Sequence, residues 1–343
     1  MEGDADVPTV DDVMKAASKA MGVPLRPKVQ GTIIPDPSFN ADDCADRLQA
    51  TMKGLGTKDR KLIEILTKHT CEQRQEIEKS YNARLGVLRD DIDSDLSGHY
   101  KDMCLSLLDP FITYDCKELN RAVRRLGTDE STLVEILFTR SNENLGKIKE
   151  EYEKTYGTTL EMDVASDTSG DFQDLLKLQM EAQRDETYKV QKEQARQDAQ
   201  ELYAAGEKRF GTSERRFNNI FCKRSFFHLK YVCEYYTEIA GHDIEEAVKS
   251  ETSGDLKSAY LDIVRMSRSL PGYFAYRLNK SMKGLGTKDL NLIRLLVSRS
   301  EIDMVQIREE YEKMFDETLA TAIQGEAMGD YEEVLLALIG HRA

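Results

Sequence analysis

The sequence predicts an all-α protein built from four repeats of about 70 residues. The segment MKGLGTKD occurs at residues 52–59 and again at 282–289, which chance does not produce in a chain of 343 residues. Apolar residues recur three and four positions apart, as in LIEILTKHTCEQRQEIEKSY, whereas strand-like alternation is scarce. We therefore expect each repeat to hold four or five helices that bury their apolar faces on one another.

Two weaker copies of the motif, VRRLGTDE at 123–130 and EKRFGTSE at 207–214, complete the set of four. The anchoring threonines, spaced by 71, 84 and 75 residues, are Thr57, Thr128, Thr212 and Thr287. An acid follows each threonine by two residues: Asp59, Glu130, Glu214 and Asp289. A second acid follows by 38 or 39 residues, with glycine three positions later: Asp95, Asp167, Glu251 and Glu326. Each motif therefore has a distant partner at a matched spacing.

These landmarks divide the chain into a head, four repeats and one connector. The head covers 1–38, and a charged connector at 182–198, expected to be exposed and helical or extended, explains the longest spacing. The four repeats are expected at 39–110, 111–181, 199–270 and 271–343.

Composition limits the classes of partner and the compartment. The formal net charge of −14 argues against nucleic acid and against direct adhesion to anionic lipid, unless a bound divalent cation reverses the local sign. The N-terminus lacks the features of a signal peptide, and VLLALIG is too short to span a bilayer, so we expect a cytoplasmic protein. The six cysteines are irregularly spaced and read as buried thiols.

The repeated loop has the chemistry of a calcium site. The two glycines of KGLGT permit a tight turn that directs several carbonyl oxygens at one point, just before a helix. Calcium prefers six to eight oxygen ligands, often with one bidentate carboxylate, and the distant acid is a candidate for that ligand. The alternative is a simple helix-start turn, with threonine as the cap and the acids solvated. Four matched copies favour the metal site.

Other site chemistries fit poorly. The loop lacks the GxxxxGK[ST] pattern of a P-loop, and no strand precedes it as a dinucleotide fingerprint requires. Asp91, Asp93 and Asp95 resemble the start of an EF-hand, but Leu96 stands where glycine is needed and Asp102 at the twelfth position. No catalytic constellation occurs, so an enzyme is not expected.

The four motifs with their distant acids resemble those of the annexins over residues 38–343. The resemblance implies five-helix repeats arranged as a curved disk, with calcium on the convex face bridging to anionic phospholipid. It also implies that the first, third and fifth residues of MKGxGT supply carbonyl ligands and that the distant acid supplies a carboxylate.

The resemblance carries over to particular residues. The first repeat gives Met52, Gly54, Gly56 and Asp95, and the fourth gives Met282, Gly284, Gly286 and Glu326. The third matches a variant loop through Gly206, Arg209, Gly211 and Glu251. The second departs from the pattern, with Val123, Arg125, Gly127 and Asp167. A side chain at the position of Arg125 penalises a turn of positive φ, so weaker binding is expected there.

Several assignments stay open in the sequence. The acids two residues after each threonine are either weaker calcium ligands or helix-dipole caps. Phe210 either enters the lipid interface or packs on its own helix. Asp115, Glu118, Glu135 and Arg140 match charged positions at the polar centre of annexin disks, where we prefer interhelix salt bridges to ion conduction.

The expected function is calcium-dependent binding to anionic phospholipid membranes, as a scaffold that is peripheral to the membrane when calcium is present. The alternative is an intracellular helical scaffold for protein partners whose calcium loops have decayed. The head is the expected site for a protein partner, and secretion by a leaderless route stays open.

Overall fold

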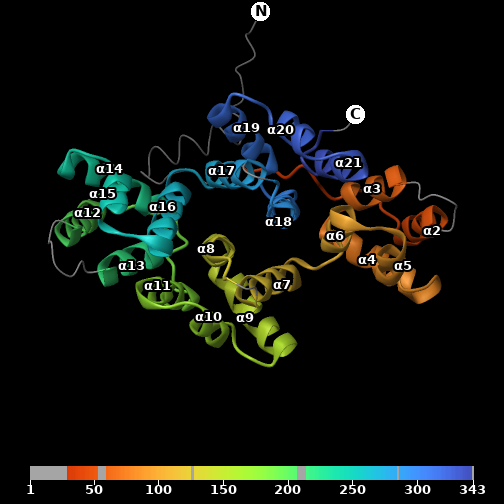
Figure 1. Cartoon of the computed structure of the whole chain (residues 1–343), viewed down its shortest axis with the longest axis horizontal. Helices are drawn as coiled ribbons and strands as arrows, with labels where there is room; N and C mark the ends of the chain where they lie inside the picture. The colour runs from red at the N-terminus through yellow and green to blue at the C-terminus, as the bar shows by residue number, and fades with distance from the viewer. Residues whose placement is uncertain (1–28, 53–58, 125–126, 207–213, 284–285, 342–343) are drawn as a thin grey trace, which may run out of the picture. The chain divides into compact units, whose positions relative to one another are not determined.

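A computed structural model describes residues 29–52, 59–124, 127–206, 214–283 and 286–341. Every regular element within these ranges is a helix, and each repeat holds five of them (Figure 1). The first repeat contains α2 (Ala41–Met52), α3 (Asp59–Lys68), α4 (Cys71–Arg84), α5 (Leu88–Asp95) and α6 (Gly98–Leu107). The second contains α7 (Phe111–Arg124), α8 (Glu130–Thr139), α9 (Asn142–Tyr156), α10 (Leu160–Asp167) and α11 (Gly170–Met180).

The second half of the chain repeats this order. The third repeat contains α12 (Lys192–Gly206), α13 (Glu214–Lys223), α14 (Phe226–Ala240), α15 (Ile244–Glu251) and α16 (Gly254–Arg268). The fourth contains α17 (Leu270–Met282), α18 (Asp289–Arg299), α19 (Met304–Phe315), α20 (Leu319–Glu326) and α21 (Gly329–Leu338). The prediction of an all-α repeated fold is confirmed for the described residues.

The described chain forms two compact units, each considered by itself. One comprises Val29–Leu133, Lys147–Thr159 and Ser269–Ala343, and therefore joins the first and fourth repeats with α7 and most of α9 from the second. The other comprises Val134–Gly146 and Leu160–Arg268, and therefore holds the third repeat with part of the second.

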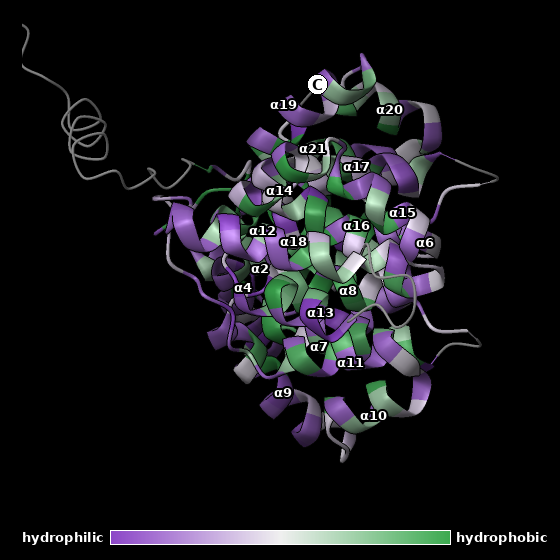
Figure 2. Cartoon of the chain, turned by 90° about the vertical axis from the view of Figure 1, so that its left-hand side faces the viewer, coloured by the Kyte–Doolittle hydropathy of each residue, from purple (hydrophilic) through white to green (hydrophobic). Residues whose placement is uncertain are grey.

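Apolar faces hold the helices together. In the unit that joins the first and fourth repeats, α3 packs on α21 and α6 packs on α18. Leu62 and Leu66 of α3 and Leu335 of α21 are fully buried, and each buried leucine stabilises the fold by about 1.5–3 kcal/mol. Figure 2 shows that individual helices carry both hydrophobic and hydrophilic residues, as amphipathic helices must.

A threonine or serine caps the third helix of the first three repeats. The side-chain oxygen accepts a hydrogen bond from a backbone N–H in the first turn. The three caps are Thr70 before α4, Ser141 before α9 and Ser225 before α14. In the fourth repeat the matching Ser300 is buried, and α19 begins only at Met304. A segment from the N-terminal end of the described chain explains this difference.

Residues 29–36, which belong to the predicted head, pack against the fourth repeat. The backbone N–H groups of Thr32 and Ile33 donate to the Ser300 carbonyl at 2.7 and 3.1 Å, and Val305 N donates to the Gln30 carbonyl at 3.1 Å. A Cβ added to Gly31 would lie 2.4 Å from the carbonyl carbon of Glu301. Only glycine therefore allows this close approach of two backbones.

Arg74 ties the first repeat to the fourth. Its side chain is 1% exposed, and it donates to the carbonyl oxygens of Leu66, His69 and Leu107. It also pairs with Glu301 at 3.0 Å. Because a buried charge is costly unless it is paired and hydrogen-bonded, this arrangement fixes the position of both partners.

Asp198 is the centre of a buried polar cluster in the third repeat. His228 Nε2 lies 2.7 Å from its Oδ2, and Arg224 donates to both carboxylate oxygens, at 2.7 and 2.9 Å. Burial by itself would raise the pKa of Asp198. Hydrogen bonds from His228, Arg224 and Gln194 outweigh burial and lower this pKa to about 2.

The connector between the second and third repeats is more firmly held than the sequence predicts. Arg184 is buried, although the whole segment was expected to be exposed. Its guanidinium donates to the Arg224 carbonyl at 2.7 Å and lies 4.5 Å from the centre of the Phe226 ring. The expectation of an exposed connector at 182–198 is therefore wrong at Arg184, and it is also wrong at Ala195 and Asp198, which are buried in α12. Charge alone did not reveal that carbonyl and aromatic partners lie nearby in the fold.

Replacing Gly31 by alanine should lower the free energy of unfolding by about 1–3 kcal/mol, because the new Cβ overlaps the backbone at Glu301. Urea denaturation measures this change. Gly146→Ala is the control, since no neighbouring atom lies within 4 Å of its added Cβ and the residue is helical. That variant should be neutral or more stable by up to about 1 kcal/mol. Equal stability of Gly31→Ala and the wild type would contradict the packing argument.

Replacing Asp198 by asparagine should destabilise the protein by about 2–3 kcal/mol at neutral pH. The folded-state pKa, about 2, is below the unfolded-state value of about 3.9. The carboxylate therefore stabilises the fold fully above that unfolded value, and the contribution is lost as the pH falls towards 2. The difference between the wild type and Asp198→Asn should shrink over this range in denaturant titrations.

Asp46→Asn is the matched control for this measurement. Asp46 is exposed and pairs with Arg84 at 3.0 Å, and an exposed ion pair contributes at most about 1 kcal/mol. A difference between the wild type and Asp198→Asn that stays constant down to pH 2 would show that Asp198 does not titrate as described.

Candidate metal centre

A carboxylate stands at the last residue of an eight-residue helix in every repeat. The four residues are Asp95 of α5, Asp167 of α10, Glu251 of α15 and Glu326 of α20, and all are exposed. The C-terminal end of a helix carries partial negative charge, so an acid there costs about 0.3–1 kcal/mol unless a cation lies nearby. The recurrence of this unfavourable placement favours a cation site.

The glycine three residues after each acid is required by the backbone. These glycines have φ between +58° and +63°, and each begins the next helix: Gly98, Gly170, Gly254 and Gly329. No neighbouring atom would obstruct a Cβ at these positions, so the left-handed conformation alone selects glycine. The tight turn leaves the acid at the edge of the fold.

In the fourth repeat, the acid and the GxGT loop lie together. Glu326 Oε2 accepts a hydrogen bond of 2.7 Å from Thr287 Oγ1, and α20 packs on α17. The loop is closed by a hydrogen bond of 2.8 Å from Lys288 N to the Ser281 carbonyl, with Gly286 at φ +84°. The alternative interpretation of the motif made this threonine the cap of the following helix. Thr287 instead holds the carboxylate, and α18 begins at Asp289 without a side-chain cap.

The first loop residue contributes its backbone rather than its side chain. Met282 ends α17, and its side chain is 2% exposed. The last carbonyl groups of a helix have no partner within the helix. In α17 those of Asn279 and Ser281 accept from the N–H groups of Lys283 and Lys288, each at 2.8 Å, so the Met282 carbonyl is the candidate oxygen donor. The ends of α17 and α20 therefore bring helix-terminal carbonyls and a carboxylate to one region.

The third repeat brings together the same two helix ends. Gly206 is the last residue of α12, and Glu251 is the last residue of α15. A Cβ on Gly206 would lie 2.6 Å from Glu251 Oε2, so the carboxylate rests against the backbone at the start of the loop. Arg209 and Gly211, the other two predicted ligands, lie outside the described residues.

The first and second repeats are described in part. Met52 ends α2, which contacts α5, the helix that carries Asp95, whereas Gly54 and Gly56 lie outside the described residues. Gly284 of the fourth repeat and Arg125 of the second lie outside them as well.

The second repeat keeps the backbone closure of the fourth. Gly127 has φ +83°, and Asp129 N donates to the Ala122 carbonyl at 3.0 Å, as Lys288 does to Ser281. The Val123 side chain is buried, as that of Met282 is. The departure at Arg125 has therefore not altered the two ends of its loop.

The donor set fits a hard cation. No group of three or more histidine, cysteine or acidic side chains gathers as a metal site within the described ranges. Backbone carbonyls and one carboxylate do not form such a group, and they are the oxygen donors that calcium prefers. The residues present therefore fit calcium better than a transition metal, which prefers imidazole or thiolate ligands.

The acids two residues after the threonines begin helices. Asp59, Glu130, Glu214 and Asp289 are the first residues of α3, α8, α13 and α18. An acid at this position is stabilised by the helix dipole, which accounts for it without a metal. Asp289 also lies 3.4 Å from His99 Nε2.

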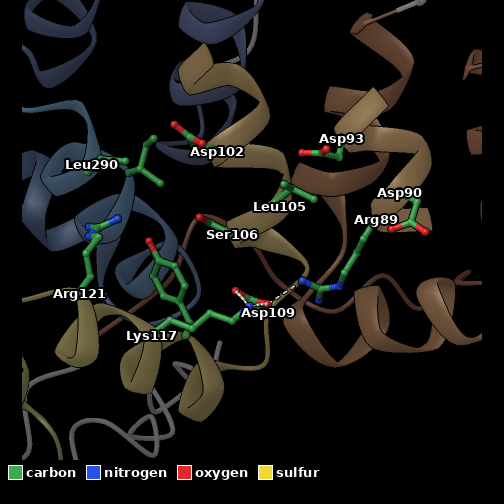
Figure 3. Close-up of a pocket in the computed structure, with 12 residues that line it drawn as sticks. Arg89, Asp90, Asp93, Asp102, Leu105, Ser106, Asp109, Lys117, Arg121 and Leu290 are labelled. Atoms are coloured by element: carbon green, nitrogen blue, oxygen red, sulfur yellow. Dashed lines mark hydrogen bonds and ion pairs between the residues drawn. The ribbon is translucent and has the colours of Figure 1, made fainter. Parts of the chain in front are cut away.

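A cavity of about 360 Å³ lies in the unit of the first and fourth repeats, and both charged and apolar side chains line it. Figure 3 shows these residues. Lys117 and Arg89 each contact the buried Asp109 at 2.7 Å. Arg121 pairs with Glu118, which also lies 3.5 Å from Arg294 of α18. Because these cationic side chains already contact carboxylates, the charged groups around the cavity form an ion-pair network. The Glu118–Arg294 contact agrees with the preference for interhelix salt bridges.

Comparison with protein families now identifies the repeats. The family model described as Annexin matches residues 42–107, 114–178, 197–263 and 273–338. The chain belongs to the annexin family. Annexins bind phospholipid in a calcium-dependent manner, and the family match gives no indication of an enzyme.

Individual annexins are similar over almost the whole chain. Annexin A4 of Mus musculus is 46% identical over 311 residues, covering 90% of this chain and 98% of that protein. The solved structure of annexin III has a TM-score of 0.88 at 40% identity and covers 92% of this chain and 98% of that one. Calcium-bound annexin (Sm)1 has a TM-score of 0.83 at 32% identity, covering 92% and 95%.

No helix in the described part of the chain is both long and apolar enough to cross a bilayer.

The sequence did not indicate that Thr287 holds Glu326, because a hydroxyl before a helix is usually interpreted as a cap. The packing of residues 29–36 was likewise missed, although Gly31 within a stretch of bulky residues was a signal.

Proposed function

We propose that this annexin binds anionic phospholipid membranes through calcium ions held at its loops. The observation that supports the proposal is the meeting of two helix C-termini beside an exposed carboxylate. Gly206 at the end of α12 lies against Glu251, and α17 packs on α20, whose last residue Glu326 accepts a hydrogen bond from Thr287 of the loop. Both helix ends carry partial negative charge, which makes the region favourable for a cation.

Three of the repeats each contribute one set of four proposed calcium ligands. They are Met52, Gly54, Gly56 and Asp95; Gly206, Arg209, Gly211 and Glu251; and Met282, Gly284, Gly286 and Glu326. Carbonyl oxygens are the donors at the loop positions, and a carboxylate is the donor at the acids. Val123, Arg125, Gly127 and Asp167 form a weaker fourth set, because Arg125 replaces the first glycine of the motif.

Bound calcium supplies positive charge and coordination positions that phosphoryl oxygens of lipid can fill. The carbonyls and carboxylates of this chain hold the ion at the surface, where the acids are exposed. Without the ion, the net charge of −14 opposes approach to an anionic bilayer. Since lipid and protein oxygens complete one site, lipid should raise the calcium affinity, and calcium the lipid affinity, by the same factor.

The proposal also covers the arrangement of the calcium sites, the location of the protein in the cell and its protein partner. Several weak sites on one convex face would add by avidity, because the membrane holds all the sites close to it after the first contact. The proposal places the protein in the cytoplasm and at membranes when calcium is present. A protein partner is assigned to the head, of which residues 1–28 lie outside the described residues.

Wild-type protein should sediment with phosphatidylserine vesicles in calcium and be released by chelator. The double variant Asp95→Asn with Glu326→Gln should need at least about tenfold more calcium, because two sites lose their carboxylate ligand. Vesicle co-sedimentation across a calcium titration measures both effects.

The control removes an acid elsewhere. Glu312→Gln changes the charge at an exposed position on α19 and should leave the calcium requirement unchanged. Binding of the wild type without calcium, or an unaltered double variant, would favour a scaffold for protein partners over the proposed function.

Thr287→Val should lower the calcium affinity of the fourth repeat by roughly tenfold, because the hydroxyl that orients Glu326 is lost at nearly constant side-chain volume. Thr287→Ser should retain the affinity of the wild type. Terbium luminescence or calorimetry with the isolated full-length variants provides the affinity, and urea denaturation checks that stability is equal. Similar affinities for the valine and serine variants would show that the hydrogen bond has no part in binding.

A further inference from the structure

One position beside the acid differs in chemistry between the repeats. The residue two positions after the acid is serine in three repeats and methionine in the fourth: Ser97, Ser169, Ser253 and Met328. It precedes the glycine that begins the next helix, which is the N-cap position, and serine is favoured there. Met328 makes no side-chain cap hydrogen bond to α21, and Ser97 and Ser169 make none to α6 and α11. The fourth repeat therefore differs from the others at this position by presenting an apolar side chain.

Met328 is far more exposed than an apolar side chain normally is. It is 86% exposed, compared with 65% for Met162 and 47% for Met314. A single exposed apolar residue is ordinary on a protein surface and needs no special explanation. The place of Met328 is what sets it apart, because it lies two residues beyond the proposed calcium ligand Glu326.

The backbone directs Met328 outward. Ala327 and Met328 are extended, with φ and ψ of −125° and 159°, and −141° and 155°. Successive residues of extended backbone point to opposite sides. Ala327 is 5% exposed and faces the core, so the next side chain faces the solvent. Glu326 is also exposed, and the methionine thus stands beside the carboxylate at the same edge of the fold.

We propose that Met328 inserts into the bilayer when the fourth repeat binds an anionic membrane. This inference rests on the proposed function, since calcium at Glu326 would bring the neighbouring residues to the headgroups. A flexible, unbranched and polarizable side chain adapts readily to the disordered boundary between headgroups and acyl chains. Removing it from water is favourable, whereas the serine of the other repeats gains little from the same transfer.

The absence of tryptophan from the sequence allows a direct test. Met328→Trp introduces one indole, whose emission should shift to shorter wavelength when calcium and phosphatidylserine vesicles are added together. Lipids brominated on their acyl chains should quench that emission. Met314→Trp, on α19 of the same repeat, should show neither change. Membrane-bound Met328→Trp with unshifted and unquenched emission would overturn the inference and leave the proposed function standing.

Met328→Ser tests the energetic contribution without adding an aromatic ring that itself favours membrane interfaces. It restores the residue of the other three repeats and should weaken vesicle binding about 3–10-fold at fixed calcium, from the loss of apolar burial. Terbium binding without lipid should be unchanged, and Met314→Ser should bind vesicles like the wild type. Unaltered vesicle affinity of Met328→Ser would overturn the inference. Failure of the wild type to bind vesicles in calcium would overturn the proposed function with it.

Discussion

The meeting of two helix C-termini is the constraint on which the proposed metal centre of this annexin depends. A helix end that exposes unpaired carbonyls is a poor neighbour for a carboxylate, and the last residue of α15 nevertheless touches the last residue of α12. Such a concentration of negative partial charge destabilises the apo protein. It is retained in a stable fold because the rest of each repeat is well packed, and it becomes favourable once a cation is present.

The surrounding helices hold these ends in place by burial and by polar contacts with little freedom. Arg74 and Asp198 are buried charges that pair with Glu301 and Arg224, and loss of either partner would leave a buried charge without compensation. Short helices depend on such contacts, because isolated helices of this length are marginal in water. A rigid scaffold is what allows exposed loops to present oxygens at a defined place.

Divergence among the repeats at two positions leaves the described backbone beside them similar. Gly127 and Gly286 have nearly the same φ, and their loops close with equivalent hydrogen bonds. The two loops nevertheless differ in sequence, because the second repeat has Arg125 where the fourth has Gly284. Met328 replaces a serine at a helix start without displacing the glycine that follows. The fold therefore tolerates a different side chain at these positions in one repeat at a time.

The sequence by itself determined the helical repeats and the pairing of each loop with its acid, because periodicity and spacing are local properties written four times. It also identified the family. Tertiary structure decided that Thr287 holds Glu326 rather than capping α18, that Arg184 is buried, and that Gly31 lies against Glu301. These depend on contacts between residues up to 270 positions apart. No local pattern records such contacts, since they exist only when the packed helices bring the partners together.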